Sequence, residues 1–375
     1  MKCKAVHTAV VGAGAISDIY LKNMMTRFSI LKVDAICASH LEHAQKKAEK
    51  YGIKACTLEE ILEDDAIEMI VNLTPAFAHA EIIRKALLAG KHVYTEKTLT
   101  ADLKSAAELV QLADEKKLYL GAAPDTFLGS ALQTARRAID EGVLGEVTSF
   151  AVSANRDNDV LLSMFSFLRT PGAGICMDYG VYYLTALVSL LGPVAQVASM
   201  VRAPYPKHLN IWKESPEYGD EMDTPNESRV SAVLQFKNGV TGTVHLDADS
   251  ALEDQAFMTI YGTKGILYLT DPNQFGGTIK FLPNPKQFDQ TTEIQILPSL
   301  ENFSDNSRGV GPAEMAWAIR EGRKSRVDKQ MAYHVLEVLC AILESGEKEQ
   351  YMTIHSDCTR PVLLGEGRGE NVLHQ

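Results

Sequence analysis

A chain of 375 residues is too long for one ordinary hydrophobic core, and 46% apolar residues argue for packed domains rather than disorder. The formal net charge of −11 repels nucleic-acid phosphates and anionic lipid, so neither nucleic acid nor a membrane is an expected partner. No run approaches the roughly 18 to 20 consecutive apolar residues that span a bilayer.

The chain begins Met1-Lys2-Cys3-Lys4 and passes through a short apolar stretch into glycines, which is typical of a first strand rather than a signal peptide. Its cysteines are scattered, without a CxxC pair or a histidine at ligand spacing. A metal site and a disulfide framework are therefore not expected. We expect reduced thiols in the cytoplasm instead. The cysteines are Cys3, Cys37, Cys56, Cys176, Cys340 and Cys358.

The first 125 residues alternate between strand and helix patterns. Strands are expected over residues 8–11, 33–38, 69–73, 92–95 and 118–122. Helices are expected over residues 15–28, 41–51, 76–89 and 100–117, with a short one opened by a capping box at Thr57-Leu58-Glu59-Glu60. Thr100 is the predicted cap of the last helix. This rhythm predicts an α/β fold with a doubly wound parallel sheet covered by helices on both faces.

The pattern changes after residue 125, where strands become more frequent. Helices are expected over residues 128–141, 174–191, 312–321 and 331–345, and a strand over 147–154. Asn238-Gly239 predicts a tight hairpin between strands 231–237 and 240–246, and a second hairpin is expected between 256–261 and 266–270. Four prolines and several charges predict a long loop over residues 204–226.

A glycine turn follows the first predicted strand and opens the first helix. Gly12 permits a tight turn, and Gly14 lets a pyrophosphate approach main-chain N–H groups at the helix N-terminus. The third position of this motif is Ser17 rather than glycine. The turn predicts a dinucleotide site, and the alternative is a turn that merely tightens strand–helix packing. The expected contacts are Gly12, Ala13, Gly14, Ala15 and Ile16.

The second strand ends without the acidic residue that commonly binds the ribose diol of NAD. Ala38 stands there, and Ser39 and His40 leave room for a 2′-phosphate, so NADP is favoured over NAD. The alternative is that Ser39 forms a capping box with Glu42.

Two further segments end predicted strands at the edge where open α/β sheets bind ligands. Thr74 and Pro75 precede His79 by about one helical turn, and all three are candidate cofactor contacts, with a purely structural histidine as the alternative. Glu96 and Lys97 follow the next strand. A lysine there can hold a substrate hydroxyl and shift neighbouring pKa values, and the alternative is a surface ion pair.

These segments together resemble the glucose-fructose oxidoreductase and inositol dehydrogenase family (Gfo/Idh/MocA), over nearly the whole chain. The resemblance rests on the motifs above and on Ala89-Gly90-Lys91-His92-Val93 and Gly172-Ala173-Gly174-Ile175-Cys176-Met177-Asp178-Tyr179-Gly180. It implies an N-terminal Rossmann domain, placed at residues 1–125, that binds NADP or NAD. It also implies a C-terminal α/β domain, placed at residues 126–375, whose large, mostly antiparallel open sheet binds substrate and pairs subunits into a homodimer or homotetramer.

The resemblance implies hydride transfer between a nicotinamide cofactor and a secondary alcohol of a sugar, polyol or inositol. By position, Lys97 contacts substrate, Glu96 supports the nicotinamide end, and Asp178 is the acid of the second domain's helix. The chain departs from the family pattern in having Thr98 where proline is usual, and Thr185 where an acid is usual. It also has Tyr182 where many members have a catalytic histidine. The resemblance implies that a tyrosine can serve there, because the glucose-fructose oxidoreductases and the dimeric dihydrodiol dehydrogenases use tyrosine at this position.

The residues themselves support a catalytic trio of Lys97, Asp178 and Tyr182. Asp178 and Tyr182 are four residues apart and share one helical face, although Tyr182 packed in the core is the alternative. Asp125, Asn155 and Arg156 are candidate substrate contacts. A competing function is a cofactor-binding sensor or regulator that kept the fold without the chemistry.

Overall fold

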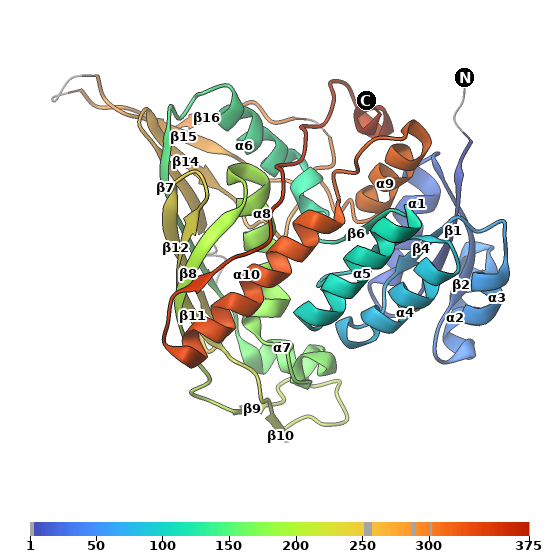
Figure 1. Ribbon diagram of the computed structural model, residues 1–375. Helices are drawn as coiled ribbons and strands as arrows, with labels where there is room; N and C mark the ends of the chain where they lie inside the picture. The colour runs from blue at the N-terminus through green and yellow to red at the C-terminus, as the bar shows by residue number, and fades with distance from the viewer. Residues whose placement is uncertain (1–3, 251–256, 287–289, 301, 375) are drawn as a thin grey trace. The chain divides into compact units, whose positions relative to one another are not determined.

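The computed structural model describes residues 4–250, 257–286, 290–300 and 302–374 (Figure 1). Its contacts divide the chain into two compact units. The first takes in residues 1–133, 301–336 and 361–375, and the second takes in residues 134–300 and 337–360. Two late segments of the chain therefore return to the unit that holds the N-terminal half. The functional boundary after residue 125 stays a prediction.

The first unit is built on a six-stranded sheet in which every neighbouring pair of strands is parallel. The order is β3-β2-β1-β4-β5-β6, so the chain turns in opposite directions from β1, and a crevice is expected beside its carboxyl end. This confirms the predicted Rossmann sheet. The strands are β1 (Val6–Val11), β2 (Leu31–Cys37), β3 (Lys54–Ala55), β4 (Met69–Asn72), β5 (His92–Thr95) and β6 (Leu120–Ala122).

Helices alternate with these strands, and the structure tests two of the helix caps that the sequence predicts. The predicted capping box is confirmed, because the Glu60 N–H donates to Thr57 Oγ1 at 3.1 Å and the Thr57 N–H donates to Glu60 Oε2 at 2.7 Å. The predicted Thr100 cap is wrong. Asp102 caps that helix by accepting the Ser105 N–H, and its side chain is the stronger acceptor for this purpose.

The helices of the first unit are α1 (Ser17–Arg27), α2 (Leu41–Tyr51), α3 (Leu58–Glu63), α4 (Ala76–Leu88), α5 (Leu103–Lys116), η1 (Thr126–Leu128), α9 (Val310–Glu321) and η4 (Gly369–Leu373). Two more helices, α6 (Ser130–Asp140) and α10 (Lys329–Lys348), begin in the first unit and end in the second.

The second unit is built on a nine-stranded sheet in the order β16-β15-β14-β13-β7-β12-β11-β8-β17. The pair β12–β7 is parallel, and the other neighbouring pairs are antiparallel, as predicted for the C-terminal domain. The strands are β7 (Val147–Asn155), β8 (Val194–Arg202), β11 (Arg229–Phe236), β12 (Thr241–Asp247), β13 (Phe257–Gly262), β14 (Gly265–Leu269), β15 (Lys280–Pro283), β16 (Gln295–Ile296) and β17 (Met352–Thr353).

Both predicted hairpins form. Asn238-Gly239 joins β11 to β12, and Gly239 has the positive φ of 88° that its turn requires. β13 and β14 pair across Thr263 and Lys264. Ala256, the predicted first residue of that hairpin, lies outside the described residues, as does Cys3.

The second unit also contains helical elements, among them the buried helix α8 (Val181–Leu191). The others are α7 (Asn158–Met164), η2 (Ser166–Arg169) and the π-helical segment η3 (Cys176–Gly180). The predicted long loop at 204–226 contains a small ribbon of β9 (Lys207–Leu209) and β10 (Glu221–Asp223). The carboxylate of Asp159 in α7 anchors β9, because it accepts the Leu209 N–H and contacts the His208 ring.

Within the described ranges, no helix combines the length and apolar character needed to cross a bilayer. Those ranges also contain no cluster of His, Cys, Asp or Glu side chains suited to a metal ion. The described cysteines Cys37, Cys56, Cys176, Cys340 and Cys358 are free thiols.

Candidate functional site

The carboxyl ends of four strands of the first unit lie in one row. Cys37, Val11, Asn72 and Thr95 are register partners in the order β2-β1-β4-β5. The turns that follow these residues therefore share one edge of the sheet. All the predicted cofactor contacts come from these turns and from the helices that they open.

Gly12 lies where β1 and β4 meet, and its backbone has a φ of +110°. A β-carbon at this position would lie 2.8 Å from the main-chain carbon and oxygen of Leu73 and 3.0 Å from the Thr74 nitrogen. Only glycine fits such an approach. The first glycine of the motif is therefore required by packing, whether or not a cofactor binds.

Gly14 has a different role, because a β-carbon there would meet nothing within 4 Å. The hydroxyl of Ser17 donates to the Gly14 carbonyl at 2.7 Å, so the serine at the third motif position closes the turn. The N-cap of α1, Ile16, makes no side-chain capping hydrogen bond. An anion can therefore approach this helix N-terminus over an open surface.

Ser39 and His40 are both exposed at the end of β2. The N-cap of α2 is His40, whose side chain makes no capping hydrogen bond, so the alternative of a Ser39–Glu42 capping box is wrong. Since α2 begins one residue later than that box requires, Ser39 lies before the cap rather than at it.

Thr74 and His79 help to fix the turns after β4 and β5. The Thr74 hydroxyl donates to Asn72 Oδ1 at 2.8 Å. His79 is buried, and its ring nitrogens lie 2.8 Å and 2.7 Å from the carbonyl oxygens of Thr74 and Thr98. Burial lowers the pKa of His79. Its ring joins the two turns, and a direct contact with a cofactor stays a prediction.

The Glu96 carboxylate is oriented from two sides. The buried Tyr20 hydroxyl donates to Oε1 at 2.7 Å, and the Lys97 N–H donates to Oε2 at 3.0 Å. Burial raises the pKa of Tyr20, which therefore remains a donor. Tyr20 was not among the predicted residues. Helical spacing along α1 could have identified it as a residue that faces the sheet.

Asp125 is not placed to contact a substrate. Its carboxylate is buried and accepts the N–H groups of Gly309 and Gly311, at 3.2 Å and 2.9 Å, where α9 begins. Burial raises the pKa of Asp125 to about 6. The sequence did not reveal this cap because its two partners lie more than 180 residues away.

In the second unit, every residue of α8 except Tyr182 is buried, in a helix that is described in full. Asp178, four residues earlier in the π-helical segment, is also partly exposed. The adjacent Tyr183 is fully buried. The alternative that Tyr182 is a core residue is therefore disfavoured, and Tyr183 takes that role.

Glu227 explains the glycine at the start of this helical region. A β-carbon at Gly174 would lie 2.1 Å from Glu227 Oε2, and the Cys176 N–H donates to Glu227 Oε1 at 2.9 Å. Burial raises the pKa of Glu227. This contact could not be predicted, because a lone glutamate in a loop is usually solvated.

Arg156, a predicted substrate contact at the end of β7, is engaged with another side chain. Its Nη2 lies 3.3 Å from Asp271 Oδ2, and its guanidinium carbon lies 3.6 Å from the centre of the Tyr179 ring. Asn155 precedes it at the end of the strand. Asp271 was not among the predicted residues; Asp271-Pro272 after a strand indicates a turn but not a distant partner.

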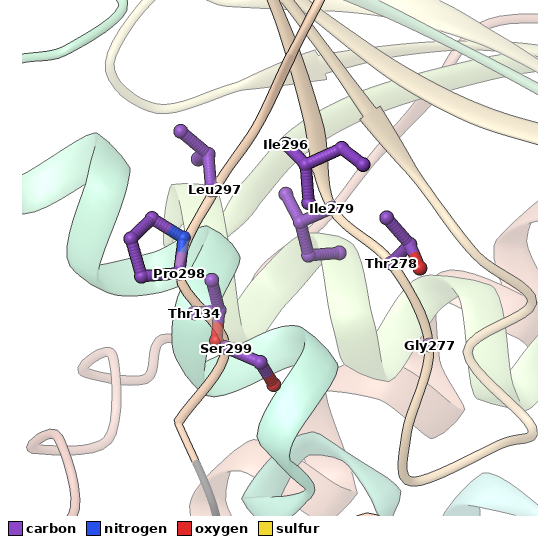
Figure 2. A pocket seen from close by; sticks show the side chains of 8 residues that line it. All are labelled: Thr134, Gly277, Thr278, Ile279, Ile296, Leu297, Pro298 and Ser299. Atoms are coloured by element: carbon purple, nitrogen blue, oxygen red, sulfur yellow. The ribbon is translucent and has the colours of Figure 1, made fainter.

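A pocket of about 270 Å³ lies in the second unit, where the chain segments of β15 and β16 diverge beside α6 (Figure 2). None of its lining side chains is ionisable, so the pocket is not suited to moving a proton. The lining residues are Thr134, Gly277, Thr278, Ile279, Ile296, Leu297, Pro298 and Ser299. None of them is a predicted site residue.

Two family models match consecutive parts of the chain. Residues 6–123 match the oxidoreductase family with an NAD-binding Rossmann fold, and residues 132–268 match the GFO/IDH/MocA C-terminal domain. Together the two matches span more than half of the sequence.

The chain is also similar to individual proteins. It is 32% identical to a dTDP-3,4-didehydro-2,6-dideoxy-α-D-glucose 3-reductase of Actinomadura kijaniata, over 76% of this chain and 81% of that protein. An uncharacterised oxidoreductase of Schizosaccharomyces pombe is 30% identical over 53% of this chain, a match that spans only 55% of its length. The solved structure of levoglucosan dehydrogenase with NADH and L-sorbose superposes with a TM-score of 0.81 at 18% identity, covering 94% of this chain and 99% of that one.

Replacing Gly14 by valine is expected to weaken dinucleotide binding without unfolding the protein. The open space at Gly14 predicts a change in the free energy of unfolding of less than about 1 kcal/mol, whereas the added side chain covers the approach to the α1 N-terminus. We expect the Kd of NADPH to rise roughly 10-fold or more, measured by calorimetry. Gly12→Val should instead lower stability, measured by urea unfolding. An unchanged Kd in a folded Gly14→Val variant would contradict the site.

Proposed function

Because the chain belongs to the GFO/IDH/MocA family of NAD(P)-dependent oxidoreductases, we propose that it transfers a hydride between NAD(P) and a secondary alcohol, or the corresponding ketone, of a sugar, polyol or inositol-like substrate. One observation carries the proposal: Tyr182 is the single side chain of the buried helix α8 that is not buried, and Asp178 is partly exposed one turn before it. Sugar-related names among the relatives support the substrate class.

The first unit has a surface that fits a nicotinamide dinucleotide. We assign its pyrophosphate to the turn of Gly12 and Gly14 with Ala13, Ala15 and Ile16, since the α1 N-terminus there has no capping side chain. Ser39 and His40 are assigned to the ribose, and Thr74, Pro75, His79 and Glu96 to the turns beside the nicotinamide end. When bound, the cofactor accepts or donates the hydride.

Tyr182 is the proposed proton donor and acceptor. Oxidation of an alcohol requires that its hydroxyl proton leave in the same cycle in which the carbon loses a hydride. An ordinary tyrosine has a pKa of about 10 and is a poor base near neutrality. A positive charge favours the phenolate, and Lys97 is the proposed source of that charge. Asp178 orients the substrate hydroxyl, and Asn155 is a further proposed substrate contact.

The competing function is a sensor that binds the cofactor without turning over a substrate. A sensor has no chemical need for a proton-transferring phenol on an otherwise buried helix. Cofactor binding without turnover of any substrate would nevertheless favour it.

Tyr182→Phe tests the proposed function most simply. Wild-type protein should oxidise or reduce at least one member of a panel of neutral polyols and sugars that includes levoglucosan and inositols. The variant keeps the ring and loses the hydroxyl, so its kcat should fall roughly 10²- to 10⁴-fold while the Kd of NADPH stays unchanged. Tyr218→Phe, which alters an exposed tyrosine, is the control. Full turnover by Tyr182→Phe, with chemistry rate-limiting, would remove Tyr182 from the mechanism.

We propose NADP as the preferred cofactor. Ala38 offers no carboxylate to a ribose diol, and the exposed Ser39 and His40 are not engaged in capping α2. The Kd of NADPH should be lower than that of NADH, and Ala38→Asp should shift their ratio towards NADH by roughly 10-fold or more, the scale of one charge-assisted hydrogen bond. Tighter binding of NADH by the wild-type protein would refute the preference.

We propose that the protein forms a homodimer or homotetramer through the nine-stranded sheet. Met200, Val233 and Phe257 are 71%, 51% and 49% exposed, and the register of their strands places all three on one face of the sheet. Large apolar side chains on one open sheet face favour association with another copy. Light scattering at micromolar concentration should give at least a dimer, which Met200→Lys/Val233→Lys should weaken. A wild-type monomer would contradict the proposal.

A further inference from the structure

The carboxylate of Asp271 binds two tyrosines of the helix that carries Asp178 and Tyr182. Its Oδ2 accepts the Tyr179 hydroxyl at 2.8 Å, and its Oδ1 lies 3.3 Å from the Tyr183 hydroxyl. The two hydroxyls are themselves 3.2 Å apart. A single carboxylate thus connects residues of two successive helical turns.

Tyr179 and Tyr183 lie on opposite sides of a change in helix type. Tyr179 belongs to the π-helical segment Cys176–Gly180, whereas Tyr183 belongs to α8. A π turn contains about one more residue than an α turn, so relaxation to α-helix would rotate the two sides relative to each other by about 100°. A link between Tyr179 and Tyr183 across this junction ties the orientation of one side to that of the other.

The same junction separates Asp178 from Tyr182. Each of these residues directly precedes one of the two linked tyrosines, so their relative orientation depends on the same rotation. Tyr179 and Tyr183 are buried, whereas Asp178 and Tyr182 are partly exposed. The helix therefore presents its linked tyrosines to the interior and the proposed reactive pair to the outside.

Asp271 is itself fixed by local structure. The Asn273 N–H donates to Oδ1 at 2.9 Å, and the Gln274 N–H donates to the Asp271 carbonyl at 3.0 Å, which together form a tight turn after β14. Arg156 supplies the opposite charge at 3.3 Å and stacks on the Tyr179 ring. This pairing offsets the cost of holding a carboxylate in a half-buried place.

The phenol of Tyr183 acts here as a donor. Burial raises its pKa, and the nearby Asp271 carboxylate adds to that effect. Tyr183 thus remains neutral and is unsuited to exchange protons with a substrate, in contrast to the role proposed for its neighbour.

We propose that Asp271, supported by Arg156, is a positioning residue that holds Tyr179 and Tyr183 across the π–α junction and so sets the orientation of Asp178 relative to Tyr182. This inference rests on the proposed function, which assigns the roles of Asp178 and Tyr182. It assigns Arg156 to this positioning group rather than to the substrate. None of the four side chains needs to touch the reacting atoms.

Hydrogen–deuterium exchange tests the link without a substrate. In Asp271→Asn, and in Tyr179→Phe/Tyr183→Phe, which keeps both rings, peptides spanning residues 174–185 should exchange at least several-fold faster than in the wild type. Peptides from β11 should be unchanged. The matched control is Tyr261→Phe, since Tyr261 is a half-buried tyrosine of β13 outside this group. Unchanged exchange at 174–185 in both test variants would overturn the proposal.

Kinetics then separate positioning from mere structural support, with levoglucosan as the probe, or the best polyol of the panel. Both test variants should lose kcat by roughly 10- to 100-fold, the scale of a misplaced reacting group, and keep the wild-type Kd for NADPH. Wild-type kcat would overturn the proposal, as would a parallel loss of kcat, NADPH binding and melting temperature. Wild-type protein without turnover would refute the proposed function, while the exchange experiment would still decide the link.

Discussion

Gly12 and the main chain of Leu73 approach so closely that no β-carbon fits between them, and the rest of the proposed nucleotide site depends on that approach. It occurs beside β1, where the parallel sheet reverses its direction of winding. The register of β2, β1, β4 and β5 places the turns that follow them at one edge. Within this frame Gly14 is free of steric contacts, so the two glycines of one motif serve packing and ligand approach separately.

The second unit exposes polar side chains on a helix that is otherwise buried. Apolar residues fill α8, and the chain leaves Tyr182 as its partly exposed residue. A helix with so little exposed surface is held firmly by packing. The hydrogen bonds of Tyr179 and Tyr183 to Asp271 add a directional constraint across the π–α junction.

Local signals predicted much of this structure. The glycine turn, the Thr57 capping box and the Asn238-Gly239 hairpin each depend on residues within a few positions, and all three form. The same local signals could not predict contacts between residues that are far apart in the sequence. Asp125 caps α9, and Asp271 binds Arg156 from 115 residues away. The ribbon of β9 and β10 was missed because its anchor, Asp159, lies in another segment. The alternative of a Ser39 capping box is wrong because α2 begins one residue later than that box requires.

The proposed reaction moves a hydride from a carbinol carbon to a nicotinamide ring. Transfer of label tests it most directly: wild-type protein is incubated with NADP⁺ and polyols deuterated at their carbinol carbons, including levoglucosan and inositols, and the cofactor is analysed by mass spectrometry. We expect one deuterium in the reduced cofactor with at least one substrate. Tight binding of the cofactor together with no label from any polyol, in either direction of reaction, would contradict it.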